Sequence, residues 1–87
     1  MHVKTKSGFE CEFEPKKVND MRVIDALASL DKGNPLALSI LCDLVFDEQA
    51  KENLYKHCEN EEHQVPIDVI TKEIVEIFSY HEQTKNL

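Results

Sequence analysis

The sequence predicts an α+β domain, in which an N-terminal β-hairpin packs on a mainly α-helical bundle. The first 14 residues alternate polar and apolar side chains, which is the period of a half-buried strand. From residue 20 onward, apolar residues recur at three- and four-residue spacings, which is the period of a helix. The predicted ranges are a hairpin at about 2–14 and about four helices, at about 20–31, 35–46, 48–58 and 67–82.

The hairpin register follows from the length of its turn. Residues 9–13, "FECEF", place phenylalanine, cysteine and phenylalanine on one face and glutamates on the other. A two-residue turn would mix polar and apolar faces, whereas a three-residue turn, Lys6 to Gly8, keeps one face apolar and puts glycine at the left-handed position. The resulting predicted pairs are Thr5 with Phe9, Lys4 with Glu10, and Val3 with Cys11.

Helix boundaries are marked by capping residues. Asn19 or Asp20 is a suitable N-cap for the first helix, and Gly33 follows its end as the residue that adopts a left-handed conformation. Asn34 is a candidate N-cap for the second helix, with Pro35 at its first position, where the missing N–H costs nothing.

The second helix is apolar on nearly all sides. Between residues 36 and 46, Ser39 and Asp43 are the polar residues. An amphipathic surface helix needs only one apolar stripe. Two interpretations stay open: this helix is the buried centre of the domain, or it presents a second apolar face to a partner. Its end, Leu44 to Phe46, and the apolar face of the hairpin are the surfaces that would then remain partly exposed.

The last two helices carry apolar stripes at helical spacing. Asp47 is the predicted cap of the third helix, and the fourth begins near Pro66. The inward residues predicted for the third helix are Ala50, Leu54, Tyr55 and Cys58. Those predicted for the fourth are Ile67, Ile70, Ile74, Ile77, Phe78 and His81.

The stretch "HCENEEH", residues 57–63, contains residue types that bind metals. A structural zinc site usually joins two closely spaced pairs of ligands, but Cys58 and His63 are five residues apart and no second pair follows. We therefore predict the polar end of a helix and a solvated loop, with no metal and no other cofactor.

Catalysis is also disfavoured. Cys42 lies in the most apolar helix, Cys58 lies among glutamates that raise a thiol pKa, and Cys11 lies on the apolar hairpin face. Asp25 and Asp43 lie beside apolar stripes, but a chain with two glycines offers no phosphate-binding loop. We expect a non-enzyme, with a small metal-dependent enzyme as the most distant alternative.

Length and charge restrict the function further. Eighty-seven residues predict one domain, 1–87, and 10 Lys/Arg against 17 Asp/Glu give a net charge of −7. Nucleic-acid binding needs a row of cations, and the clearest basic pair is Lys16 and Lys17. No apolar run approaches the roughly 20 residues of a membrane span, and the first residues lack the apolar segment of a signal peptide. We expect a cytoplasmic protein with no nucleic-acid, membrane or small-molecule partner.

The order of the features resembles a family. The segments that carry the likeness are "DMRVIDALASLDKGNPLAL", "VPIDVI" followed by "EIF", and the terminal Lys85-Asn86. Together they resemble the small tail assembly chaperones of long-tailed phages and prophages of Gram-positive bacteria, over nearly the whole chain. Leu87 and the absence of a glycine before "VP" depart from the family pattern.

The resemblance implies a cytoplasmic protein that acts in phage assembly and is absent from the finished virion. Such chaperones coat the tape measure protein, keep it soluble, and help to recruit subunits of the major tail protein. Self-association, and a longer form made by ribosomal frameshifting near Lys85, are further expectations from the family.

An acidic chaperone of this kind needs accessible apolar helix surface and no catalytic pocket. The candidate partner-binding residues are Leu41, Leu44, Val45, Phe46, Ile77 and Phe78. The alternative function is another small acidic interaction module, such as a prophage regulator or an inhibitory partner.

Overall fold

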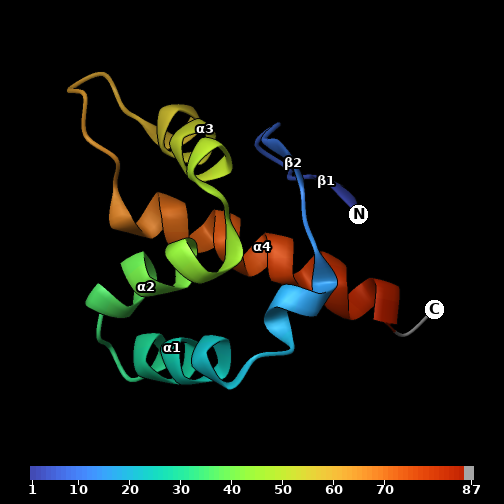
Figure 1. The fold of residues 1–87 in the computed structure, drawn as a ribbon. Coiled ribbons are helices and arrows are strands. Elements are labelled where there is room, and N and C mark those ends of the chain that lie inside the picture. Colours follow the sequence, from blue (N-terminus) through green and yellow to red (C-terminus); the bar gives the residue numbers. More distant parts are fainter. Residues whose placement is uncertain (86–87) are drawn as a thin grey trace.

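The computed structural model describes residues 1–85, with side chains up to Ser79. Its elements are β1 (His2–Lys4), β2 (Glu10–Glu12), the 3-10 helix η1 (Pro15–Val18), α1 (Met21–Asp31), α2 (Leu36–Val45), α3 (Glu48–Cys58) and α4 (Ile67–Lys85). Helix α4 runs across the middle of the molecule, with α3 and the hairpin on one side and α1 and α2 on the other (Figure 1). The predicted α+β class is confirmed.

The hairpin has the predicted register. Strands β1 and β2 are antiparallel and pair His2 with Glu12, Val3 with Cys11, and Lys4 with Glu10. The Thr5 N–H donates to the Phe9 carbonyl at 2.8 Å, and the Gly8 N–H donates to the Thr5 carbonyl at 3.0 Å. Gly8 has a φ of +97°, which a residue with a side chain rarely adopts. The three-residue turn therefore fixes which face of the hairpin is apolar.

The predicted caps of the helices are present. The Asp20 carboxylate accepts a hydrogen bond from the Arg22 N–H at 2.9 Å, and the Asp47 carboxylate accepts one from the Ala50 N–H at 2.8 Å. Gly33 follows α1 with a φ of +96°, and its N–H donates to the Leu30 carbonyl at 3.0 Å.

Helix α2 begins at Leu36, one residue later than predicted, and Pro35 directly precedes it. The Asn34 side chain still satisfies one N–H of the first turn, since its Oδ1 accepts from the Leu36 N–H at 3.2 Å. The predicted positions are therefore shifted by one residue: Pro35 occupies the N-cap, and Asn34 precedes it and bonds to the first turn.

The 3-10 helix η1 was not predicted from the sequence. It turns the chain from the hairpin into α1, with Pro15 as its first residue and the Lys17 N–H donating to the Glu14 carbonyl at 3.0 Å. A single turn of four residues has no periodicity that a hydrophobic pattern would reveal.

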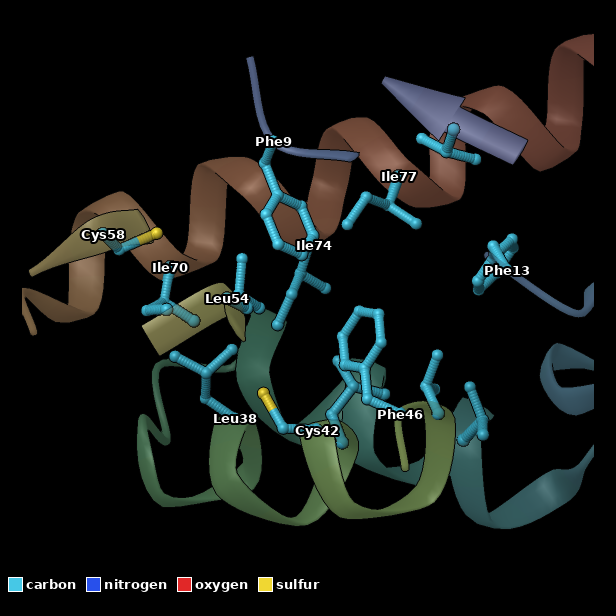
Figure 2. Packing of buried hydrophobic residues seen from close by; sticks show 14 of the residues in the cluster. Phe9, Phe13, Leu38, Cys42, Phe46, Leu54, Cys58, Ile70, Ile74 and Ile77 are labelled. Atoms are coloured by element: carbon cyan, nitrogen blue, oxygen red, sulfur yellow. The ribbon is translucent and has the colours of Figure 1, made fainter. Parts of the chain in front are cut away.

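The core joins both sides of α4. Figure 2 shows Phe9 of the hairpin, Ile74 of α4 and Phe46 after α2 pointing into one apolar cluster. The buried apolar residues are Val3, Phe9, Phe13, Val23, Ala26, Ala37, Leu38, Leu41, Cys42, Val45, Phe46, Leu54, Cys58, Ile70, Ile74 and Ile77.

The predicted stripe of α4 is confirmed except at its ends. Ile70, Ile74 and Ile77 are buried and Phe78 is partly buried. Ile67 is 58% exposed, so its predicted burial is wrong. It occupies the first position of the helix, directly after the loop, where the core no longer covers it. The side chain of His81 lies outside the described residues.

None of the described helices is both long enough and apolar enough to cross a membrane.

Candidate functional site

The apolar excess of α2 is divided between two faces. Leu38, Leu41 and Val45 are buried in the core. Leu36 and Ile40, one helical turn apart, are 77% and 58% exposed. Both interpretations of α2 therefore hold in part: one side of the helix is buried in the core, and another side keeps an apolar stripe at the surface.

Further apolar side chains are exposed on α1 and α4. Among the described side chains, the large apolar ones that are exposed are Met21, Ile24, Leu36, Ile40, Ile67, Val69 and Val75; we call these seven the exposed apolar set. Single exposed apolar residues are ordinary on protein surfaces. Seven on three helices of an 87-residue chain, two of them in register on α2, make these helices the candidate site.

The candidate binding residues named from the sequence lie elsewhere. Leu41, Val45, Phe46 and Ile77 are buried in the core, and Leu44 and Phe78 are partly buried against it. The expectation that the end of α2 stays accessible is therefore wrong for Val45 and Phe46. The apolar face of the hairpin is likewise covered, because Val3, Phe9 and Phe13 are buried.

A signal for the exposed stripe was present in the sequence. Ser39 and Asp43 are four residues apart and mark the solvent-facing side of α2. Leu36 and Ile40 fall on that side at helical spacing. The two polar residues of α2 therefore define its exposed side, and that side does not include Val45 and Phe46.

An ion pair accompanies the apolar stripe of α2. The carboxylate of Asp43 pairs with the Lys51 ammonium of α3 at 2.6 Å, and the hydrogen bond to Asp43 raises the pKa of Lys51. Asp43 nevertheless remains 61% exposed on the side of α2 that carries Ile40. The stripe therefore lies beside an exposed ion pair, and the whole chain carries a net charge of −7.

A second cluster, which the sequence did not reveal, attaches the hairpin turn to α4. Glu73 is buried, and its Oε1 accepts hydrogen bonds from the Thr5 hydroxyl at 2.9 Å and from the Ser7 hydroxyl at 2.6 Å. The Lys6 N–H also donates to Glu76 Oε2 at 2.6 Å. Three consecutive residues of the turn, 5–7, are thus bound by two glutamates one helical turn apart.

His57 completes this cluster from α3. Its Nε2 is 2.8 Å from the Ser7 hydroxyl oxygen and 3.9 Å from Glu73 Oε1, and its ring centroid is 5.5 Å from that of Phe9. The Ser7 hydroxyl has one proton, which it donates to Glu73, so the Nε2–H of His57 donates to Ser7. In a nucleophilic serine–histidine pair the imidazole instead accepts the hydroxyl proton. The geometry is that of a structural connection.

The stretch "HCENEEH" divides between this cluster and a loop. His57 binds the hairpin turn, Cys58 is buried, and residues 59–64 form an exposed loop, as predicted. The Asn60 side chain orders the loop by accepting from the Glu62 N–H at 2.9 Å and the Gln64 N–H at 3.0 Å. Within the part of the chain that the structure describes, no three His, Cys, Asp or Glu side chains are placed to hold a metal ion.

The three cysteines are free thiols. Burial raises the pKa of Cys42 to about 11, and burial together with the charge of Glu73 raises the pKa of Cys58 to about 11. Burial also raises the pKa of Cys11. Because the thiolate is the nucleophile, these environments suppress reactivity at neutral pH.

Comparison with known proteins adds no relative to this picture: no family model, curated protein or solved structure matches the chain.

Proposed function

We propose that this protein is a tail assembly chaperone of a long-tailed phage or prophage, which binds the tape measure protein and assists assembly of the tail tube. It acts by reversible binding in the host cytoplasm, without catalysis, and is left out of the finished virion. The major tail protein is its second proposed partner, and self-association accompanies its action. The sequence likeness over residues 20–38 and 65–78 supports the identity of the client.

The observation that carries the proposal is the exposed apolar set. Covering one leucine or isoleucine side chain contributes about 1.5–3 kcal/mol, so a client that covers several gains substantial affinity. The four-residue spacing of Leu36 and Ile40 matches the way in which two helices pack along one stripe. A long helical client with apolar faces fits this surface.

The charge of the protein supports the same role. A chaperone must cover apolar client surface without bringing apolar surface of its own to the outside of the complex. The net charge of −7 keeps a coated client soluble, because neighbouring copies present like charge to the solvent.

Co-expression with the tape measure protein tests the proposal. The native chaperone should raise the soluble yield of that protein. Leu36→Asp combined with Ile40→Asp should abolish most of this effect while leaving the fold intact, because both positions are already exposed. Each substitution should weaken binding about tenfold or more, since it removes about 1.5–3 kcal/mol of burial.

Ser39→Asp is the control for each single substitution, because it adds one negative charge to the exposed side of α2, as Leu36→Asp or Ile40→Asp does, without removing an apolar group. Rescue that survives the double substitution, in a protein shown to be folded, would refute the site. A native protein that gives no rescue would refute the function.

The gene neighbourhood separates the chaperone from a regulator or inhibitor, because a chaperone gene should directly precede a very long helical reading frame.

A further inference from the structure

The hairpin has an open edge. The described residues form a two-stranded sheet, with β1 on one side of β2 and no strand on the other. Backbone hydrogen bonds join Thr5 to Phe9 and Met1 to Phe13. Because hydrogen-bonded and non-hydrogen-bonded pairs alternate along an antiparallel ladder, Val3 and Cys11 are a hydrogen-bonded pair, and the pairs that contain Glu10 and Glu12 are not. The backbone N–H and C=O groups of Glu10 and Glu12 therefore point away from β1.

These outward groups are available to another strand. None of the described residues makes a hydrogen bond to the backbone of Glu10 or Glu12 across that edge. The side chains of Glu10 and Glu12 are 54% and 76% exposed. An edge strand with unpaired backbone groups is the surface to which an extended peptide adds.

The residues of β1 show which kind of sequence pairs with β2. Its residues His2, Val3 and Lys4 lie opposite Glu12, Cys11 and Glu10 respectively, so that a basic–apolar–basic pattern faces a glutamate–apolar–glutamate pattern. The His2 ring binds both carboxylates, with Nε2 2.9 Å from Glu10 and Nδ1 3.0 Å from Glu12. Opposite charges in paired strands stabilise a sheet.

We propose that the free edge of β2 binds an extended segment of a partner polypeptide with alternating basic and apolar residues. The basic side chains pair with Glu10 and Glu12 on the solvent-facing side, and the backbone bonds to the outward groups of both residues. A second copy that joined β2 to β2 would bring glutamates against glutamates, which disfavours that occupant. The edge contains no residue of the exposed apolar set, so the proposal goes beyond the proposed function and does not depend on it.

Fluorescence anisotropy with a labelled, blocked hexapeptide of alternating lysine and valine tests the proposal. The peptide should bind, and binding should weaken as salt is raised, because the charges are exposed. A peptide of alternating glutamate and valine should not bind. Two further lysine–valine peptides would be made, each N-methylated on the N–H groups along one of the two edges of the extended peptide. The peptide that is methylated on the edge facing β2 should bind at least about fivefold more weakly than the peptide methylated on the other edge.

Variants of β2 separate the backbone from the charge. Glu12→Gln should weaken binding of the lysine–valine peptide several-fold at low salt. Glu12→Pro should weaken it further, by about fivefold relative to Glu12→Gln, because proline removes the outward N–H while the ladder to β1 remains. Should Glu12→Pro fail to fold, the N-methylated peptides make the same test on the native protein.

Three results would overturn the proposal: equal binding of the lysine and glutamate peptides, equal binding of both N-methylated versions and the parent peptide, or a change of oligomeric state on Glu12→Pro substitution. The last would assign the edge to a second copy. None of these results bears on rescue of the tape measure protein, so failure here and failure of the proposed function are distinguishable.

Discussion

Glu73 is the residue on which the docking of the hairpin turn depends. It is a buried carboxylate that receives two hydroxyl hydrogen bonds from the turn and lies 3.9 Å from the His57 imidazole nitrogen. A buried charge is tolerated when its hydrogen-bonding capacity is filled. Among the described side chains no buried nitrogen or oxygen lacks a partner, so the cluster is satisfied as it stands.

Replacing Glu73 with alanine should therefore destabilise the protein. The substitution leaves the Thr5 and Ser7 hydroxyls without their acceptor, at a cost of about 2 kcal/mol in the free energy of unfolding. Urea denaturation followed by circular dichroism measures this change. Glu52→Ala, at an exposed position of α3, is the control and should stay within about 0.5 kcal/mol of the native value. A Glu73→Ala protein as stable as the control would contradict the assigned role.

His2 makes the stability of the hairpin depend on pH. Hydrogen bonds that the His2 ring donates to Glu10 and, to a lesser extent, to Glu12 raise the pKa of His2 above 6.5, so the contribution of His2 to stability is present below pH 6.5 and is lost as the pH rises through the folded-state pKa. The hydrogen bond to His2 lowers the pKa of Glu10 below 4.5, so that contribution is present above pH 4.5 and is lost as the pH falls through its folded-state pKa. The pair should support the hairpin most fully between about pH 4.5 and 6.5.

An NMR titration measures this effect through the His2 ring protons and the Val3 amide. Both should report a midpoint above 6.5, and in a His2→Gln variant the Val3 amide should lose that transition. A His2 midpoint at or below its ordinary value would show that the two carboxylates do not bind the ring in solution.

At the scale of elements, local signals predicted most of the fold. The hairpin register followed from the alternation of "FECEF" and the position of Gly8, both of which depend on residues close in sequence. The caps at Asp20 and Asp47 are local as well, because a capping side chain bonds to an N–H two or three residues away.

What the sequence could not predict depends on contacts between distant residues. The bond between Ser7 and Glu73 joins positions 66 residues apart, and that between Ser7 and His57 joins positions 50 apart. No spacing within α3 or α4 indicates that a hairpin turn will bind there. The candidate site was only half predicted: the apolar excess of α2 was recognised, but its exposed side was placed at Val45 and Phe46 instead of Leu36 and Ile40.

At the scale of the whole molecule, a small core and a surplus of apolar residues act together. Eighty-seven residues enclose a limited volume, and α4 already receives α1 and α2 on one side and α3 and the hairpin on the other (Figure 1). The seven side chains of the exposed apolar set lie outside that core, on the three helices α1, α2 and α4. These are the side chains that the proposed client would cover.

The most direct test of this account is an NMR footprint of the client on the protein. Methyl groups of isoleucine, leucine and valine would be labelled, and spectra recorded as a soluble fragment of the tape measure protein is added. The account predicts that the methyl signals of Ile24, Leu36, Ile40, Ile67, Val69 and Val75 include the largest changes, while those of the buried Leu41, Val45, Ile74 and Ile77 change little. Changes centred on the buried methyls, with the exposed set unaffected, would contradict it.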